Sequence, residues 1–281
     1  MNRLTLREFI EDQNTEDFQS LQEKLIMFNN GKRYGQIVFL AGGAGSGKGF
    51  AIKNFMEKEK FKVRDVDEWK VGLLKLAKER GRNPELSKLN LKTPEDVFKL
   101  HTVVKNLGIK DKTLDLLLTD LKTDRLPNII FDITLKEIGD ITEVLPRLIE
   151  LGYDAKNVHL AWVLTNYSIA VKNNAGRDRV VPDDIMLATH EGAANTMAKI
   201  IQGKTPSGID GKVVVILNNR ENTIFFDKSS NTGEKVIKDF TYVTMKKEGK
   251  PFSKEKEVQA QVFDWIKNNI PKSDQTKELF K

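Results

Sequence analysis

The residues best suited to chemistry form a glycine-rich stretch that contains one lysine, GGAGSGKG, at residues 42 to 49. It directly follows the apolar run 36 to 40 and precedes a helical pattern from 50 to 58. A strand that feeds a glycine-rich turn into a helix points backbone N–H groups and the positive end of a helix dipole at one spot, which favours a bound phosphate. The stretch is therefore predicted to bind nucleotide phosphates. The predicted binding residues are Gly42, Gly43, Ala44, Gly45, Ser46, Gly47, Lys48, Gly49 and Phe50.

The stretch fits the pattern G-x-x-x-x-G-K at Gly42, Gly47 and Lys48, but it departs from the usual motif at the next position. Lys48 is placed to reach the β- and γ-phosphates of ATP or GTP. Gly49 stands where a Ser or Thr hydroxyl normally binds Mg²⁺. Nucleotide binding is therefore expected, whereas efficient turnover is in question. A flexible glycine-rich turn is the alternative, and the strand and helix on either side argue against it.

Three aspartates follow predicted strands. Asp67 comes just after the second strand, where it could accept the proton of an acceptor hydroxyl or could cap the helix that begins at Glu68. Asp65 is the second choice for the base. Asp132 ends the apolar run 128 to 131, and we expect it to hold Mg²⁺ directly or through water. Carboxyl ends of parallel strands share one edge of a sheet, so these groups should converge on the glycine-rich loop.

Two arginines lie in the segment NNAGRDRVVP, between two predicted helices. Arg177 and Arg179 could close over the γ-phosphate and stabilise the transferring charge, because guanidinium groups bind phosphate oxygens in pairs. We treat 173–182 as a lid and both arginines as candidate catalytic residues, together with Lys48 and Asp67. His190, inside the next predicted helix, is interpreted as a packing or surface residue rather than a catalyst.

The composition narrows the class of protein. The 281 residues contain no cysteine and three separated histidines, which excludes disulfides, thiol catalysis and cysteine-based zinc sites. The net charge is +6, but lysines alternate with acids, as in 254 to 257, so solvated surface is favoured over nucleic-acid binding. No apolar run approaches the ~20 residues that span a bilayer, and the acidic N-terminus does not resemble a signal peptide. We expect a cytoplasmic protein with no membrane partner.

Strands alternate with helices along most of the chain, which predicts an α/β fold with a parallel sheet and helices on both faces. Strands are expected at 36–40, 61–66, 128–131, 157–164 and 212–217. A mostly helical insertion at about 70–125 is too long for a plain crossover and is predicted to form a lid or an acceptor pocket. We divide the chain into an N-terminal helical segment (1–30), a core (31–217) and a β-rich and helical C-terminal extension (218–281).

Two further expectations concern side chains near these motifs. Thr134 and Glu137 form a capping box, which predicts that a helix begins there and runs to Leu151. Trp69 and Trp162 are interpreted as core residues, with the alternative that Trp69 walls a substrate pocket beside Asp67.

Four blocks in order resemble the zeta-toxin-like group of P-loop kinases. They are GGAGSGKG, VRDVDEWK, NIIFDITLKE, and LGYDAKNVHLAWVL leading into NNAGRDRVVPDDI. The resemblance covers roughly residues 36 to 200. It implies a P-loop NTPase fold, ATP or GTP with Mg²⁺, Asp67 as catalytic base, and Arg177 and Arg179 as phosphate ligands. For the toxin members it also implies a nucleotide-activated amino sugar as acceptor.

Together these features predict a P-loop kinase that transfers the γ-phosphate of ATP to a hydroxyl of a small molecule or nucleotide sugar. A nucleotide-gated binding or assembly protein with weak ATPase activity is the main alternative, and Gly49 supports it. A polynucleotide kinase is a third option, supported by the basic charge alone. An inhibitory or assembly protein partner is kept open.

Overall fold

The structure is a computed structural model, and it describes residues 34–56, 61–81, 84–119, 126–219, 225–229, 235–237, 241–252 and 256–271. The helices predicted within residues 4 to 29 lie outside these ranges.

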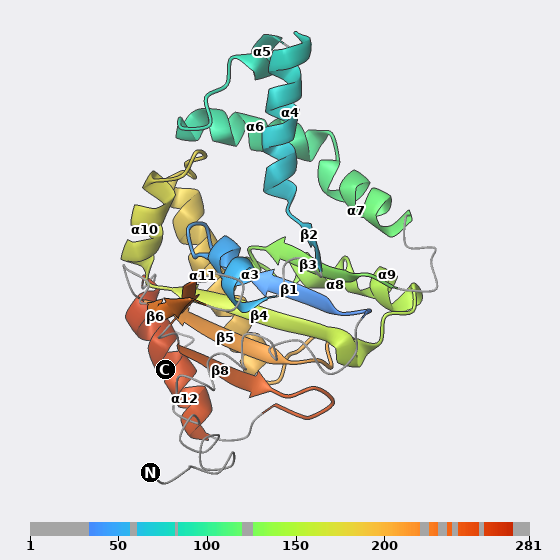
Figure 1. Cartoon of the computed structure of the whole chain (residues 1–281), viewed down its shortest axis with the longest axis vertical. Coiled ribbons are helices and arrows are strands. Elements are labelled where there is room, and N and C mark those ends of the chain that lie inside the picture. The colour runs from blue at the N-terminus through green and yellow to red at the C-terminus, as the bar shows by residue number, and fades with distance from the viewer. Residues whose placement is uncertain are drawn as a thin grey trace, which may run out of the picture.

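A six-stranded sheet in the order β2-β3-β1-β4-β5-β8 forms the centre of the protein (Figure 1). The strands are β1 (Ile37–Ala41), β2 (Phe61–Arg64), β3 (Asn128–Ile133), β4 (Val158–Thr165), β5 (Val213–Asn218) and β8 (Thr241–Lys246). All neighbouring pairs are parallel except β5 and β8. The predicted parallel α/β sheet is confirmed, and β1 lies between β3 and β4.

Helices cover both faces because the central strands are apolar on both sides. All residues of β1 and β4 are buried, as expected for parallel strands with covered faces. Helix α3 (Lys48–Phe55) packs on one face through Ala51, Ile52 and Phe55. The opposite face packs against five helices, α7 (Ile109–Thr119), α8 (Gly139–Thr142), α9 (Leu145–Glu150), α11 (Asp183–Ile201) and α12 (Lys256–Asn269).

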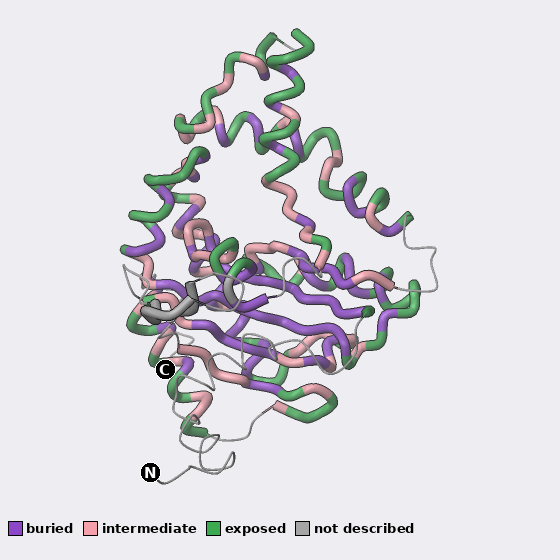
Figure 2. Tube along the Cα trace, viewed as in Figure 1, coloured by how far each residue is buried: buried purple, intermediate pink, exposed green. Residues whose placement is uncertain are grey.

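The predicted helical insertion stands above the carboxyl edge of the sheet (Figure 1). It comprises α4 (Val66–Arg80), α5 (Pro84–Ser87), α6 (Pro94–Asn106) and α7. A small cluster of its own, which includes Ala77, Leu86, Leu100 and Val104, holds these helices together. Figure 2 shows that much of this part is exposed, in contrast to the buried sheet. Helices α4 to α6 therefore overhang the sheet, whereas α7 packs into the core of the sheet through Leu114 and Leu118.

The C-terminal segment adds to the same sheet. Strand β8 pairs antiparallel with β5, and α12 packs on β4, β8 and α11 with Val262 and Ile266 buried. Strands β6 (Phe225–Ser229) and β7 (Lys235–Ile237) form a separate two-stranded sheet.

Two local predictions are wrong. Thr134 does not cap a helix: its hydroxyl donates to Asp140, and the predicted single helix is split into α8 and α9. The chain turns first at Leu135, which is fully buried with φ of 57°, so the backbone cannot enter a helix there. Trp69 is 48% exposed, whereas Trp162 is buried in the core as predicted.

Helix α10 (Tyr167–Ala175) follows β4 and precedes α11. No helix in the described part of the chain is long and apolar enough to cross a membrane.

Candidate active site

The glycine-rich loop connects β1 to α3, which is the arrangement that its sequence pattern requires. Thr165, at the end of β4, and Asn218, at the end of β5, both donate to the carbonyl oxygen of Ser46, at 2.7 and 3.0 Å. The strand ends thus hold the loop over the carboxyl edge of the sheet. This is the edge at which ligands bind in parallel α/β proteins.

Gly43 and Gly45, like Gly42, have no room for a side chain. Gly45 has φ of 72°, and a Cβ there would collide with the carbonyl oxygen of Ala170 in α10. A Cβ on Gly43 would collide with the ring of His190, whose Nε2 lies 2.8 Å from the Ala44 carbonyl oxygen. Helix α11 therefore supports the loop through His190, which is buried there rather than lying on the surface.

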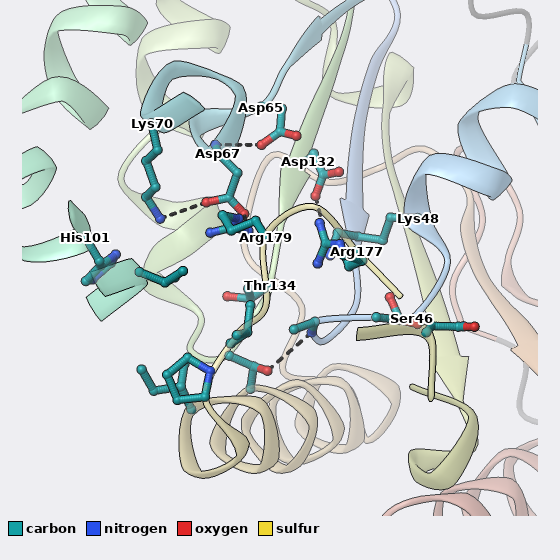
Figure 3. A pocket seen from close by; sticks show the side chains of 18 of the residues that line it. Ser46, Lys48, Asp65, Asp67, Lys70, His101, Asp132, Thr134, Arg177 and Arg179 are labelled. Carbon is teal, nitrogen blue, oxygen red and sulfur yellow. Dashed lines mark hydrogen bonds and ion pairs between the residues drawn. The ribbon is translucent and has the colours of Figure 1, made fainter. Parts of the chain in front are cut away.

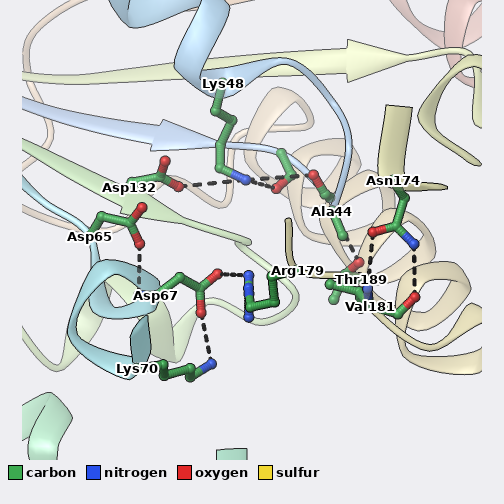
Figure 4. Close-up of polar contacts among 12 residues, drawn as sticks. Ala44, Lys48, Asp65, Asp67, Lys70, Asp132, Asn174, Arg179, Val181 and Thr189 are labelled. Atoms are coloured by element: carbon green, nitrogen blue, oxygen red, sulfur yellow. Dashed lines mark hydrogen bonds and ion pairs between the residues drawn. The ribbon is translucent and has the colours of Figure 1, made fainter. Parts of the chain in front are cut away.

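Lys48 folds back over the loop that carries it. Its Nζ donates to the Gly42 carbonyl oxygen at 2.6 Å and lies 3.5 Å from Asp132 Oδ1 (Figure 4). The Gly42 and Asp132 oxygens therefore serve as the partners of the Lys48 ammonium group in this structure. The next residue, Gly49, is exposed, and a Cβ there would have no atom within 4 Å.

A cavity of about 600 Å³ joins the loop to the helical insertion (Figure 3). Residues 44 to 49 form its floor, and Phe50, at the start of α3, points away with 41% of its surface exposed. The predicted site residues Asp65, Asp67, Asp132, Arg177 and Arg179 all line this cavity. The structure thus brings these five residues together. Gly42 and Gly43, at the start of the loop, are buried and do not line the cavity.

Asp132 ends β3 beside Lys48. Burial raises the pKa of its carboxyl group to about 6; Lys48 offsets part of this effect, and the negative charges of Asp65 and Asp67 add to it. Lys48 therefore does not fully offset the effect of burial on this carboxyl group, and a bound cation would further favour its ionised form.

Asp67 has a different environment. It is not a helix cap, because Asp65 caps α4 by accepting from the Asp67 backbone N–H at 2.7 Å. Lys70 donates to Asp67 Oδ1 at 2.7 Å, and Arg179 donates to Oδ2 (Figure 4). Burial alone would raise the pKa of the Asp67 carboxyl, but Arg179, Lys70 and Lys48 outweigh it and lower the pKa to about 2.

The segment that carries Arg177 and Arg179 is a loop whose two ends are held together by hydrogen bonds. The Asn174 side chain donates to the Val181 carbonyl oxygen at 2.8 Å and accepts from the Val181 N–H at 3.0 Å. The Val180 N–H donates to the carbonyl oxygen of Leu91 in the insertion at 3.0 Å. The loop is thereby tied to its own base and to the insertion, and it buries Arg179 while Arg177 stays exposed.

Several cavity residues carried no recognised signal in the sequence. The insertion contributes Lys70 from α4 and Val97, Phe98 and His101 from α6, and α11 contributes Thr189. Lys70 lies three residues after Asp67 on the same helix, so the i, i+3 spacing could have pointed to the pair. The α6 residues depend on how the insertion folds over the loop, which no local motif records.

The described residues do not form a metal cage of their own. No group of three or more His, Cys, Asp or Glu side chains among them could hold an ion. A nucleotide-bound Mg²⁺, however, usually takes only one or two carboxylates, with phosphate oxygens and water as the other ligands. Asp132 fits that requirement, because it is a partly buried carboxylate in the cavity whose desolvation Lys48 only partly offsets.

No family model matches the chain, and no curated protein matches it either. Among solved structures it is similar to the AvrRxo1-ORF1:AvrRxo1-ORF2 complex with ATP, at 13% identity and a TM-score of 0.44, over 98% of this chain and 83% of that one. It is also similar to a chain from the PezAT chromosomal toxin–antitoxin system of Streptococcus pneumoniae, at 16% identity and a TM-score of 0.41, over 95% and 91% of the two chains.

The mixed sheet of mostly parallel strands, with the glycine-rich loop between β1 and α3, defines an α/β fold of the P-loop NTPase type.

Proposed function

We propose that the protein is a P-loop kinase that transfers the γ-phosphate of ATP, or of GTP, to a hydroxyl of a small molecule or nucleotide sugar. The proposal rests on one observation: the glycine-rich loop, Asp67, Asp132 and Arg179 all line the same cavity. Phosphoryl transfer needs a phosphate cradle, cations against the migrating charge and a carboxylate at the acceptor. These residues supply all three.

In this proposal the backbone N–H groups of the loop and Lys48 bind the β- and γ-phosphates. Phosphate oxygens would replace the Gly42 carbonyl as the acceptor for Lys48, since an anionic acceptor makes the stronger hydrogen bond. Arg177 and Arg179 stabilise the charge of the transferring group. Asp67 orients the acceptor hydroxyl, a role that suits a carboxylate whose pKa of about 2 makes it a weak proton acceptor.

Mg²⁺ bound with the nucleotide would supply positive charge at the β- and γ-phosphate oxygens, and Asp132 is the residue that would hold it, directly or through water.

The variant Asp67→Asn tests this assignment. It keeps the shape of the side chain and removes its charge, so phosphoryl transfer should fall by about 100-fold or more while ATP affinity stays nearly unchanged. Transfer is measured by ³¹P NMR and affinity by calorimetry with MgATP. Wild-type transfer by this variant would exclude Asp67 from the chemistry.

Gly49 favours a second function, that of a nucleotide-gated binding protein with weak turnover, because it removes the usual hydroxyl ligand of Mg²⁺. The space around Gly49 is open, so Gly49→Ser is free of steric clashes. For a weakened kinase we expect Gly49→Ser to raise Mg²⁺-dependent turnover by about 10-fold, the effect of one additional charge-assisted contact. An unchanged rate in a steady-state ATPase assay would favour the binding protein, or a metal held without this hydroxyl.

A further inference from the structure

Helix α4 buries a lysine in the wall of the cavity while it exposes the neighbouring tryptophan. Lys70 is 7% exposed, against 48% for Trp69. Burying an ammonium group costs free energy unless it is paired with a charge and hydrogen-bonded. Figures 3 and 4 show its partner: Lys70 reaches across one turn of α4 to Asp67 Oδ1, at 2.7 Å. The burial of Lys70 is therefore linked to the carboxylate at the centre of the site.

Both members of this pair have unused hydrogen-bonding capacity. An ammonium group has three N–H donors, and in the described part of the chain Lys70 uses one of them, on Asp67. A carboxylate has about four lone-pair positions, and Lys70 and Arg179 take one on each oxygen of Asp67. Lys70 and Asp67 both line the cavity. A ligand there meets a donor and an acceptor side by side.

A neutral hydroxyl group is the ligand that fits both. Its O–H donates to Asp67 while its oxygen accepts from Lys70. A protonated amine can only donate and is repelled by Lys70, and a carboxylate can only accept and is repelled by Asp67. We propose that Lys70 binds the oxygen of the acceptor hydroxyl and that, with Asp67, it selects neutral alcohols as acceptors. This inference rests on the proposed kinase function.

The neighbouring wall suits the carbon skeleton of such an alcohol. Val97, Phe98 and His101 of α6 also line the cavity. Burial, followed by the charge of Lys70, lowers the pKa of His101, so this side chain is neutral near pH 7. The α6 wall thus adds apolar surface without a further charge.

The transfer step gives Lys70 a larger effect on rate than on binding. The acceptor oxygen forms a bond to the γ-phosphorus, the bond from that phosphorus to the β,γ-bridging oxygen breaks, and its electron pair leaves with ADP. Asp67 holds the hydroxyl proton in a hydrogen bond, and this proton passes to water as the new bond forms. As the proton moves away from the acceptor oxygen, negative charge grows on that oxygen, and the Lys70 ammonium group stabilises it.

Water is itself a neutral hydroxyl acceptor, so ATP hydrolysis tests the inference before the natural acceptor is known. We would measure MgATP hydrolysis, and transfer to glycerol by ³¹P NMR, in the full chain and in three variants. Lys70→Met removes the charge and keeps the length of the side chain, and Lys70→Arg restores the charge. Lys75→Met is the matched control on the same helix, where the side chain is 75% exposed.

The expected result is that Lys70→Met lowers kcat by about 10- to 100-fold, the range for a lost hydrogen bond to a charged group, with unchanged ATP affinity. Lys70→Arg should recover part of the rate, and Lys75→Met should match wild type. The acid limb of the pH–rate profile should move to higher pH in Lys70→Met, because Asp67 then keeps only Arg179 and Lys48 as nearby cations. Asp65, Asp132 and His101 also face this carboxylate and stay unchanged.

Three results would overturn the inference. Wild-type kcat in Lys70→Met, with the wild-type enzyme active, removes Lys70 from the acceptor site and leaves the kinase proposal standing. Loss of ATP affinity together with kcat in both Lys70 variants assigns this residue a structural role instead. A wild-type protein that consumes no ATP with water, glycerol or any other alcohol overturns the kinase proposal, and the inference falls with it.

Discussion

Asp67 and Asp132 line the same cavity, yet their surroundings shift the pKa values of their carboxyl groups in opposite directions. Asp132 is partly buried with Lys48 3.5 Å away, and its pKa rises to about 6, whereas Asp67 is held by Arg179 and Lys70 and its pKa falls to about 2. At pH 7 both are ionised, and only Asp67 is fully compensated. Asp132 is thus the carboxylate that gains most from an added cation.

This difference predicts how stability depends on pH. The folded-state pKa of Asp132 lies above its unfolded value of about 3.9, so this group stabilises the fold below pH 4 and loses that contribution as pH rises through 6. The folded-state pKa of Asp67 lies below its unfolded value, so its contribution is present above pH 4 and is lost as pH falls through 2. The two effects occupy separate pH ranges.

The side chain in the variant Asp132→Asn has no charge at any pH. This variant should therefore lack the fall in stability that the ionisation of Asp132 causes between about pH 4 and 6. Without nucleotide we expect it to be more stable than wild type at pH 7 by about 1 to 3 kcal/mol and nearly equal at pH 4. Urea unfolding at several pH values between 4 and 7 measures this difference. Parallel stability curves for the two proteins over that range would contradict the raised pKa of Asp132.

At the scale of elements, the site depends on contacts between segments that the sequence separates widely. The loop 175–182 is closed by Asn174, joined to the insertion at Leu91, and joined to α4 through Arg179 and Asp67. We predicted this segment as a hinged lid from its glycine and arginines. The sequence could not reveal the Asn174 contacts, because an asparagine near the end of a helix has many alternative roles.

The Asn174 contacts can be tested by one substitution. Asn174→Ala leaves the Val181 N–H and carbonyl without their partner, which should lower the free energy of unfolding by about 1 to 3 kcal/mol. The opened loop should also expose Arg179 and let trypsin cut faster at Arg177 and Arg179. Urea unfolding and limited proteolysis give the two readouts, with Asp178→Ala, an exposed position of the same loop, as control. Equal cleavage rates in Asn174→Ala and wild type would show that these contacts do not hold the loop.

At the scale of the whole molecule, the chain pattern predicts the parallel strands well because each is an apolar run buried on both faces. The phosphate-binding loop follows from a motif with strict local geometry. The antiparallel addition of β8 to the sheet is a long-range pairing that periodicity does not encode. The burial of Lys70 and the exposure of Trp69 were also missed, since α4 places a charged residue inward to meet Asp67.

The central claim is that this fold transfers phosphate from ATP to a hydroxyl group. The most direct measurement is ³¹P NMR of the full chain with MgATP and a panel of nucleotide sugars, nucleosides, short oligonucleotides and simple alcohols, beside Lys48→Ala. We predict a new phosphomonoester resonance with wild type and a loss of about 100-fold or more in its rate with Lys48→Ala, since Lys48 is the proposed γ-phosphate ligand. ATP that stays bound but unconsumed across the whole panel would contradict the claim.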